Sequence, residues 1–280
     1  MIRAIPALLV MAMITVVAMP LQWISLKLGL PTRRWIPLAF HRVGVRAFGL
    51  RVTVLGQPAA ERPLLLVSNH SSWLDIVTLS SILPVVFIAK SEIARWPLFG
   101  LFAKLQRSVF VNRSKRQETS EVNRTIASRL GEGDPVVLFG EGRASDGNRV
   151  LPFRSALLGA LKDALGENGR GFVQPVSVAY TRLQGVPMGR QFRPVAAWYG
   201  DMNLVTHLKR VLSEGAIDVV VTFGVPLEVE PGVDRKFLAR AAEDAVRRMT
   251  SAALAGREPA RPAPISLGNP AAVSLAPESR

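Results

Sequence analysis

The chain has 280 residues, which suits one large α/β domain or two small ones, and 49% of them are apolar, which excludes wholesale disorder. It contains no cysteine, which excludes a disulfide scaffold, a zinc–cysteine site, an iron–sulfur cluster and a cysteine nucleophile. The 35 Lys and Arg residues outnumber the 21 Asp and Glu residues, and the net charge of +14 draws the protein to anions. Because the mean hydropathy is also positive, at +0.24, we expect an anionic membrane surface as a partner and no nucleic acid.

The N-terminus carries the strongest membrane signal. Residues 4–26 contain no formal charge, and at about 1.5 Å per residue they could cross a hydrocarbon core of about 30 Å. Pro6 and Pro20 interrupt this stretch, so a shallow or re-entrant helix and a cleaved signal peptide are the alternatives. The basic residues that follow are Lys27, Arg33, Arg34, Arg42, Arg46 and Arg51. The positive-inside rule therefore predicts a protein of the cell inner membrane, with its bulk on the cytoplasmic face.

Residues 35–50 mix aromatic and aliphatic side chains with arginines. This pattern predicts an amphipathic helix on the bilayer, with Trp23 and Trp35 at the level of the headgroups and Pro37 in the first turn. An ordinary surface helix of the globular domain is the alternative. We expect residues 1–50 to form a membrane-anchoring helical segment.

The remainder alternates between strand and helix patterns. The predicted strands are 51–55, 63–68, 85–89, 108–111, 135–139, 172–179 and 217–223. The predicted helices are 73–83, 97–105, 120–130, 155–165, 202–212 and 235–255. This alternation predicts an α/β domain over residues 51–256, with a mixed, largely parallel central sheet flanked by helices. Residues 257–280 form a tail rich in Pro and Ala that we expect to be disordered.

The sharpest motif is NHSSWLD at residues 69–75, between an apolar strand and a helix. His70 is the side chain best suited to move protons near neutral pH, and Asp75 on its second ring nitrogen would fix the tautomer. Residues five apart lie about 140° apart on a helix, so the pair meets only if His70 precedes the helix and Asp75 lies in its first turn. Ser71 or Ser72 could then cap that helix, whose free N–H groups would lie near an anion. A capping turn with a structural histidine is the alternative.

A second polar motif, FGEGRASDG at residues 139–147, follows the predicted strand 135–139. Glu141 and Arg143 flank a glycine at the carboxyl end of a strand, the edge at which open α/β sheets bind ligands. An ordinary Gly-rich loop is the alternative. P-loop, dinucleotide-binding, GxSxG and HExxH motifs are absent from the sequence. Of the other two histidines, we expect His41 on the surface and His207 as a polar residue on a helix.

The order and flanks of these motifs resemble the glycerolipid acyltransferase family that includes 1-acylglycerol-3-phosphate acyltransferase. The family's first motif, His-x4-Asp, corresponds to His70 and Asp75. Its second motif, an apolar strand ending near an arginine, corresponds to residues 110–113 with Arg113. Its third motif, FPEGTRS, corresponds to residues 139–145, and its fourth, a proline inside an apolar strand, to Pro175. The resemblance covers roughly residues 60–225.

The resemblance implies that His70 acts as a general base on a lysolipid hydroxyl and that Asp75 orients it. The resulting oxygen would attack an acyl thioester of acyl-carrier protein or coenzyme A, without a covalent acyl-enzyme. Backbone N–H groups at the helix after His70 would hold the oxyanion. No metal and no cofactor are implied, since the thioester is a co-substrate. The substrate-binding residues that the resemblance implies are Arg113, Glu141, Gly142, Arg143, Ser145, Arg154 and Pro175.

Three positions depart from the family's third motif: Gly140 replaces Pro, Arg143 replaces Thr and Ala144 replaces Arg. Since that arginine is expected to bind the acceptor phosphate in glycerophosphate acyltransferases, its loss argues against a plain phosphate acceptor. Residues 145–155 and 198–202 resemble a bacterial branch that includes lyso-ornithine lipid O-acyltransferases. That acceptor carries a 3-hydroxyl on a fatty-acyl chain, a carboxylate and an amine. Glu141 or Asp146 could meet the amine, and an arginine the carboxylate.

The sequence thus predicts an O-acyltransferase that converts lyso-ornithine lipid into ornithine lipid. A 1-acylglycerol-3-phosphate acyltransferase that makes phosphatidic acid is the alternative acceptor class. A non-catalytic basic membrane-binding module, which would bind lipid without turnover, is the alternative from another functional class.

Overall fold

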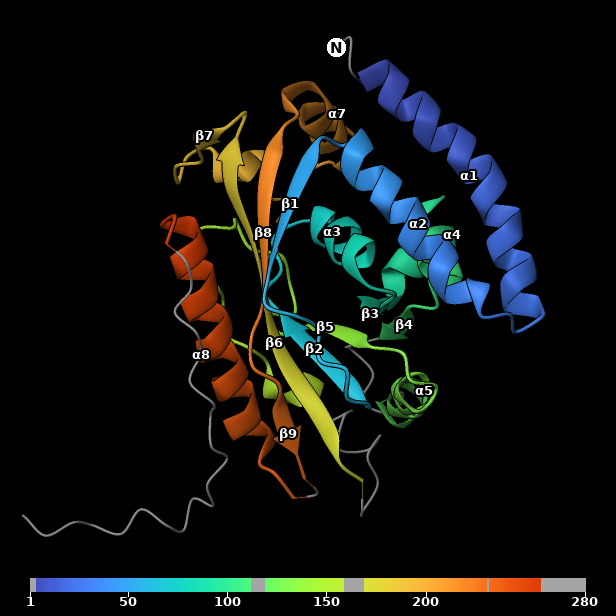
Figure 1. Cartoon of the computed structure of the whole chain (residues 1–280), viewed down its shortest axis with the longest axis vertical. Helices are drawn as coiled ribbons and strands as arrows, with labels where there is room; N and C mark the ends of the chain where they lie inside the picture. The colour runs from blue at the N-terminus through green and yellow to red at the C-terminus, as the bar shows by residue number, and fades with distance from the viewer. Residues whose placement is uncertain (1–3, 112–118, 159–168, 231, 258–280) are drawn as a thin grey trace, which may run out of the picture.

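The computed structural model describes residues 4–111, 119–158, 169–230 and 232–257, which form a central sheet with helices on both faces (Figure 1). The strands are β1 (Leu50–Leu55), β2 (Leu64–Ser68), β3 (Val86–Lys90), β4 (Val109–Val111), β5 (Val136–Phe139), β6 (Gly171–Leu183), β7 (Val186–Pro187), β8 (Ile217–Phe223) and β9 (Leu227–Val229). The α-helices are α1 (Ala4–Lys27), α2 (Thr32–Ala47), α3 (Leu74–Ile82), α4 (Phe99–Leu105), α5 (Thr119–Gly131), α7 (Leu204–Glu214) and α8 (Arg235–Leu254). Short 3₁₀ turns are η1 (Ser91–Arg95), η3 (Ser155–Leu158) and η4 (Arg193–Val195).

The sheet is mixed and largely parallel, as the sequence predicts. Among the described residues its strand order is β1-β8-β6-β2-β5-β3-β4, and β7 and β9 pair with β6. Strands β6, β2, β5, β3 and β4 run parallel to one another, whereas β8, β7 and β9 run antiparallel to β6. Every residue of β2 and β5 is buried, because parallel strands in the middle of such a sheet are covered on both faces. Strands β7 and β9, which the sequence did not predict, lengthen the antiparallel side.

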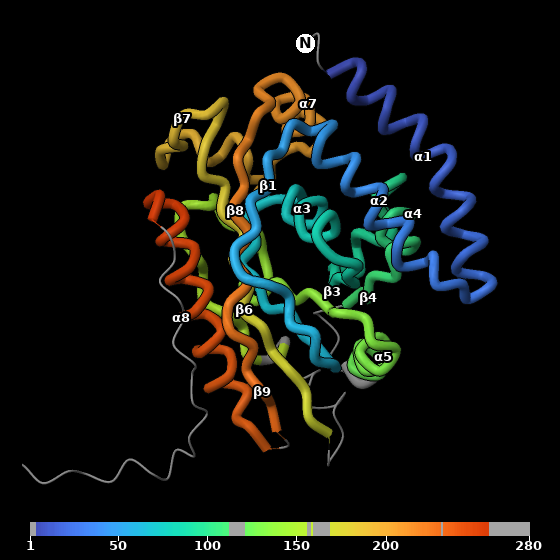
Figure 2. The backbone as a smooth tube through the Cα atoms, viewed as in Figure 1, coloured from blue at the N-terminus to red at the C-terminus, as the bar shows by residue number. Residues whose placement is uncertain are grey.

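Successive side chains of the central strands enter two separate apolar clusters. Leu66 of β2 packs with Leu79 of α3 in one cluster, which also contains residues of α7. Leu65 of β2 packs with Ile126 of α5 and Leu238 of α8 in the other. Helices α3 and α7 thus cover one face, and α5 and α8 cover the opposite face (Figures 1 and 2).

Helix α1 continues without a break through Pro20, and within the described residues it is the one helix long and apolar enough to cross a membrane. Most of its large apolar side chains are exposed, whereas Gln22 and Ser25 are buried against the rest of the protein. The Ser25 hydroxyl lies 2.7 Å from the Thr32 hydroxyl, across the turn into α2. The apolar helix and the basic residues after it indicate association with a membrane.

Helix α2 begins three residues earlier than predicted, so Pro37 lies in its second turn and not in its first. A proline at that place leaves the carbonyl of Arg33 without its helical N–H partner. The Gln22 side chain supplies the missing donor: its Nε2 donates to the Arg33 oxygen at 3.0 Å and to the Leu105 oxygen at 2.8 Å. The proline in α2 therefore creates an acceptor that docks α1 onto α2 and α4.

The segment that the sequence places on the bilayer packs on the α/β domain. Helix α2 contacts α1, α3 and β1 and buries Leu38 and Gly44, while Trp35 is exposed. This packing supports the alternative of a helix that belongs to the domain. His41, which the sequence places on the surface, is partly exposed: its Nε2 lies 3.1 Å from Oε1 of Gln106, and desolvation lowers the pKa of His41 to about 4.

Parts of two predicted segments lie outside the described residues. Only η3 is described from the predicted helix 155–165, and only Arg257 from the tail 257–280. The division into residues 1–50, 51–256 and 257–280 therefore stays a prediction.

Candidate active site

The two polar motifs emerge at one edge of the sheet. Strands β2 and β5 are parallel neighbours, with Ser68 level with Phe139, and both strands end there. Strand β6 passes on the other side of β2, with Val176 level with Ser68. Because parallel strands in register end at the same edge, His70 and Glu141 are brought together although 71 residues separate them.

His70 and Asp75 meet in the geometry that the spacing predicts. His70 precedes α3 and Asp75 lies in its first turn, which places Nδ1 of His70 2.8 Å from Oδ2 of Asp75. With Nδ1 donating to the carboxylate, Nε2 carries the lone pair that can accept a proton. The His70 side chain is 20% exposed, so a substrate can reach it, and its ring stacks on Phe139 with 4.0 Å between centroids.

The Asp75 carboxylate is fully buried and accepts four hydrogen bonds. Its Oδ2 also accepts from the amides of Ser71 and Ser72, at 2.7 and 2.9 Å, and its Oδ1 accepts from the Tyr180 hydroxyl at 2.6 Å. These bonds hold the loop before α3 against the helix and fix the carboxylate behind the imidazole. They also occupy the amides of Ser71 and Ser72, which precede α3, whereas the oxyanion role of amides at the start of that helix stays a prediction.

Tyr180 and Asn69 complete the site in ways that the sequence did not reveal. Tyr180 lies in the apolar strand β6, where nothing local distinguishes its hydroxyl from an ordinary core side chain. Asn69 follows β2 and exchanges two 2.9 Å hydrogen bonds with the backbone of Val178, so its amide continues the sheet pairing past the last residue of β2. Both contacts depend on the register between β2 and β6.

Glu141 is buried, at 2% exposure, and its Oε1 accepts a 2.9 Å hydrogen bond from the His70 amide. The pKa of Glu141 is raised to about 8: burial is the main cause and nearby Asp75 adds to it, whereas the amides of His70 and Leu151 and the Arg143 charge oppose the rise. Close to neutral pH the Glu141 carboxyl is therefore largely protonated. It ties the third motif to the backbone of the first.

This raised pKa predicts a pH-dependent stability. Between pH 4.5 and about 8, the Glu141 carboxyl is protonated in the folded protein and ionised in the unfolded chain. The contribution of Glu141 to stability is thus complete below pH 4.5 and is lost as the pH rises from 4.5 to about 8. Over that range the free energy of unfolding falls with a limiting slope of about 1.4 kcal/mol per pH unit. We expect Glu141→Gln to flatten this dependence in denaturant unfolding of the detergent-solubilised protein. Parallel pH curves for wild type and variant would contradict the assignment.

Gly140 has a steric reason to differ from the family's proline. A Cβ at this position would lie 2.6 Å from two carbons of the Phe153 ring. The ring is held over Gly140 because the Arg154 amide donates to the Gly140 oxygen at 2.9 Å and the Phe153 amide to Oε2 of Glu243 at 2.8 Å. The third motif therefore packs directly against an aromatic side chain of the following segment.

Substitution of Gly140 by alanine is expected to lower the free energy of unfolding by about 1–3 kcal/mol, because the Phe153 ring must shift. Gly131→Ala is the matched control: Gly131 ends α5, and a Cβ there meets no atom within 4 Å. We expect the control to be neutral or slightly stabilising. Equal unfolding midpoints for the two variants would show that the packing of Phe153 does not constrain this turn.

The other predicted site residues divide into three groups. The Ser145 amide and hydroxyl both donate to the His70 carbonyl, at 2.9 and 3.2 Å, so Ser145 holds the loop of the first motif. Arg143 and Arg154 have exposed side chains beside this edge. Gly142 forms the turn after β5 with a φ of 71°, and its amide donates to the Phe139 oxygen.

Of the remaining predicted residues, one lies away from this site and one lies outside the described residues. Pro175 is buried inside β6, level with Val67, and side-chain alternation places it on the sheet face opposite Tyr180. Arg113 lies outside the described residues. His207 is buried in α7, and its Nδ1 accepts a 3.0 Å hydrogen bond from the Trp73 indole, in line with the predicted polar residue on a helix. Within the described part of the chain, no group of three or more His, Asp or Glu could hold a metal ion.

Comparison with known proteins places this arrangement in a family. A family model described as Acyltransferase matches residues 51–181. The chain is 51% identical over 259 residues to a lyso-ornithine lipid O-acyltransferase of Brucella abortus, across 92% of this chain and 97% of that protein. This chain belongs to the acyltransferase family. It is an enzyme of the lysolipid acyltransferase type, and the resemblance seen in the sequence motifs is confirmed.

Two further relatives and one solved structure extend the comparison. The acyltransferase is 44% identical over 278 residues to a lyso-ornithine lipid O-acyltransferase of Rhizobium meliloti, across 97% of this chain and 95% of that protein. It is 34% identical over 199 residues to a 1-acyl-sn-glycerol-3-phosphate acyltransferase of Neisseria gonorrhoeae, across 70% and 74%. Its fold is similar to the 1-acyl-sn-glycerophosphate acyltransferase PlsC of Thermotoga maritima, with a TM-score of 0.58 at 22% identity, across 89% and 95%.

Proposed function

We propose that this acyltransferase moves a fatty acyl group from an acyl thioester to the 3-hydroxyl of lyso-ornithine lipid, which gives ornithine lipid. The observation that carries the proposal is the buried Asp75 carboxylate on Nδ1 of a partly exposed His70. The names of the relatives at 51% and 44% identity support the choice of acceptor. The thioester is carried by acyl-carrier protein or coenzyme A.

In this mechanism Nε2 of His70 takes the proton of the acceptor hydroxyl, and the oxygen attacks the thioester carbonyl. The tetrahedral intermediate collapses, the carbon–sulfur bond breaks, and the leaving thiolate takes the proton back from the imidazolium. Asp75 remains a carboxylate throughout and stabilises the imidazolium. The acyl group passes directly between the two substrates, so no residue of the chain becomes acylated.

The acceptor's head group is proposed to lie at the edge formed by the third motif. The exposed Arg143 and Arg154 offer guanidinium groups to its carboxylate, and Arg113 from the second motif is a further candidate. Ser145, Gly142 and Glu141 support this edge through the backbone of the first motif. The enzyme is proposed to work at the cytoplasmic face of the inner membrane, where the basic residues after α1 meet anionic lipid.

Lysophosphatidic acid is the second candidate acceptor, because the relative from Neisseria gonorrhoeae is named 1-acyl-sn-glycerol-3-phosphate acyltransferase. The deciding assay measures transfer of a labelled acyl group. Membranes that contain the protein receive a labelled acyl-carrier-protein thioester together with either lyso-ornithine lipid or lysophosphatidic acid. Product mainly from the first acceptor supports the proposal, and product mainly from the second replaces it with phosphatidic acid synthesis. If neither acceptor becomes labelled, with coenzyme A thioesters as well as acyl-carrier-protein thioesters, the result favours the non-catalytic membrane-binding module.

Tyr180→Phe is expected to lower kcat by about tenfold and to shift the acid limb of the pH–rate profile upward by about 0.5–1 unit. The phenylalanine keeps the ring but removes the hydroxyl that donates to Oδ1 of Asp75. A carboxylate with one donor fewer holds the imidazolium proton of His70 more tightly, so a higher pH is needed to free the base. The measurement is kcat against pH with the preferred acceptor.

Thr250→Val is the matched control for this hydroxyl deletion. Thr250 of α8 shares a buried 2.7 Å hydrogen bond with Ser177 of β6, on the sheet face opposite Tyr180. The control loses a buried hydroxyl at comparable cost to stability but leaves Asp75 untouched, so its acid limb should coincide with that of wild type. An unshifted limb in Tyr180→Phe would reduce Tyr180 to a packing role.

A further inference from the structure

A basic hollow lies at the edge of the sheet opposite the candidate active site. It has a volume of about 400 Å³ and is lined by Leu26, Arg33, Lys104, Arg107, Arg129 and Glu132, among others. These residues come from the end of α1, the start of α2, the end of α4, the turn before β4 and the end of α5. Because Asp134 precedes β5 whereas Gly140 follows it, the length of the sheet separates the hollow from His70.

The charges around this hollow do not balance. The Glu132 carboxylate lies 2.6 Å from Arg107, 3.0 Å from Arg33 and 3.2 Å from Arg129. Burial alone raises the pKa of Glu132, but the three arginines outweigh it and hold that pKa below its ordinary value. One carboxylate thus faces three guanidinium groups.

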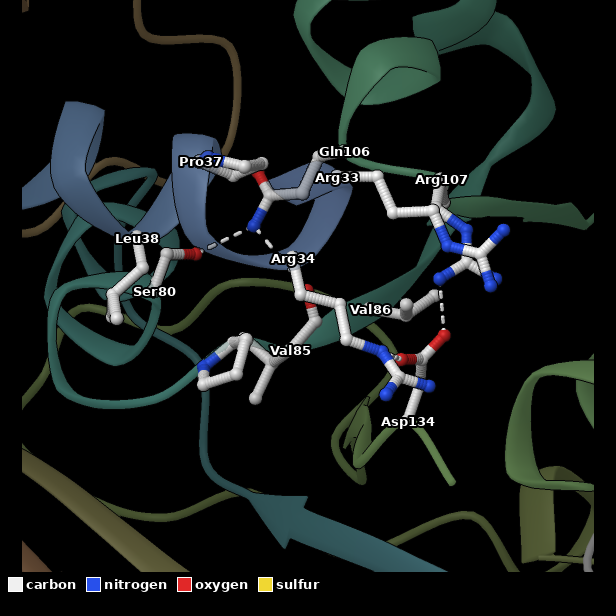
Figure 3. A pocket seen from close by; sticks show the side chains of 11 residues that line it. Arg33, Arg34, Pro37, Leu38, Ser80, Val85, Val86, Gln106, Arg107 and Asp134 are labelled. Carbon is white, nitrogen blue, oxygen red and sulfur yellow. Dashed lines mark hydrogen bonds and ion pairs between the residues drawn. The ribbon is translucent and has the colours of Figure 1, made fainter. Parts of the chain in front are cut away.

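The neighbouring carboxylate does not restore the balance. Asp134 pairs with Arg34 at 2.6 Å and with Arg107, and Figure 3 shows both guanidinium groups directed to it, with Arg33 beside Arg107. Lys104 is exposed and makes no ion pair within the described residues. Five cations therefore share two carboxylates, which leaves three positive charges at a partly enclosed surface.

The hollow is fixed at the end of the apolar helix. Leu26, which lines it, is followed by Lys27, the last residue of α1, and the Lys27 ammonium lies 5.8 Å from the centre of the Trp23 ring. Gln22 and Ser25 tie this end of α1 to α2 and α4. A lysine and a tryptophan at the end of an apolar helix mark the level of the lipid headgroups, so the surplus positive charge lies at that level.

We infer that this hollow binds the phosphate of an anionic membrane phospholipid, with Arg33, Lys104 and Arg129 as its contacts. Guanidinium groups suit phosphate oxygens because each can donate two parallel hydrogen bonds. The bound lipid would fix the depth and tilt of the protein at the end of α1, away from the reacting groups. The inference rests on charge and on the helix end, and it is independent of the acceptor proposed above.

The test uses the full chain in an uncharged detergent. Phosphatidylglycerol, phosphatidylcholine of the same acyl chains and inorganic phosphate are titrated separately, and native mass spectrometry counts the bound molecules. The hollow variant combines Lys104→Ser with Arg129→Gln. The control variant combines Lys236→Ser with Arg240→Gln, which removes the same charges from exposed positions on α8.

The hollow variant is expected to bind phosphatidylglycerol about 25-fold more weakly at low ionic strength, which corresponds to about fivefold for each cation removed. Phosphatidylcholine binding and the control variant should be unaffected, and turnover of detergent-dispersed substrate should match wild type. Should the double variant fail to fold, Lys104→Ser alone carries the test with an expected loss of about fivefold.

Three results would overturn the inference. An equal loss in the hollow and control variants would mean that net charge alone attracts the lipid. Inorganic phosphate bound as tightly as phosphatidylglycerol would assign the hollow to a soluble anion. Acyl-carrier protein binding that is lost in the hollow variant, with lipid binding retained, would assign it to an acidic protein partner.

Discussion

Substitution of His70 by alanine is expected to lower kcat for acyl transfer by about 1,000-fold, the scale on which a positioned general base contributes to a reaction. Without Nε2 no group of the first motif can take the acceptor's proton, since Asp75 is buried and fully occupied by hydrogen bonds. The fold should persist, because the His70 ring is partly exposed and Asp75 retains three of its four donors. The measurement is kcat with labelled thioester at saturating acceptor, together with the thermal unfolding midpoint.

His41→Gln is the control for loss of a histidine. His41 contacts Gln106 between α2 and the end of α4, outside the candidate active site, and glutamine can keep that hydrogen bond. Its kcat should stay within about twofold of wild type, since substitutions away from a site rarely change the reaction. A His70→Ala enzyme with near wild-type kcat would refute the general-base mechanism and revive the structural-histidine alternative.

Asp75→Asn should lower kcat by about 100-fold to 10,000-fold while the protein remains folded. The asparagine oxygen can take the place of Oδ2 and accept from His70, Ser71 and Ser72, and its amide nitrogen can donate to the Tyr180 oxygen. The hydrogen-bond geometry is thus retained and only the negative charge is lost. The imidazolium formed during the reaction then has no counter-charge.

Asp75→Ala separates this electrostatic effect from the structural one. The alanine variant leaves two buried amides and the Tyr180 hydroxyl without an acceptor, at an expected cost of about 3 kcal/mol or more in unfolding free energy. The asparagine variant should lose far less stability. If Asp75→Asn turned over like wild type while Asp75→Ala unfolded, Asp75 would be a loop cap and not part of the reaction.

Much of the fold could be predicted because its signals are local. The apolar runs of β2 and β5, the helical spacing of α3 and the turn residues between them lie within short windows of sequence, and their strand and helix assignments are confirmed. The His70–Asp75 pair could be predicted for the same reason, since five residues and one helix start determine whether the side chains meet. The uncharged stretch of α1 is likewise visible in the sequence alone.

Contacts between distant segments were decided only by the tertiary structure. Tyr180 reaches Asp75 across 105 residues, and this contact depends on the pairing of β6 beside β2. The same holds for Phe153 over Gly140 and for the Gln22 side chain that replaces the helical donor missing at Pro37.

The physical reason is the range of the interactions. Propensity, periodicity and capping act between near neighbours, so the sequence by itself determined most of the elements, the apolar helix and the His70–Asp75 pair. Sheet order and register are set by the burial of whole faces, which no short window contains. Only the folded chain could therefore decide which hydroxyl supports Asp75, which ring excludes a side chain at Gly140, and that five cations gather around two carboxylates at the end of α1.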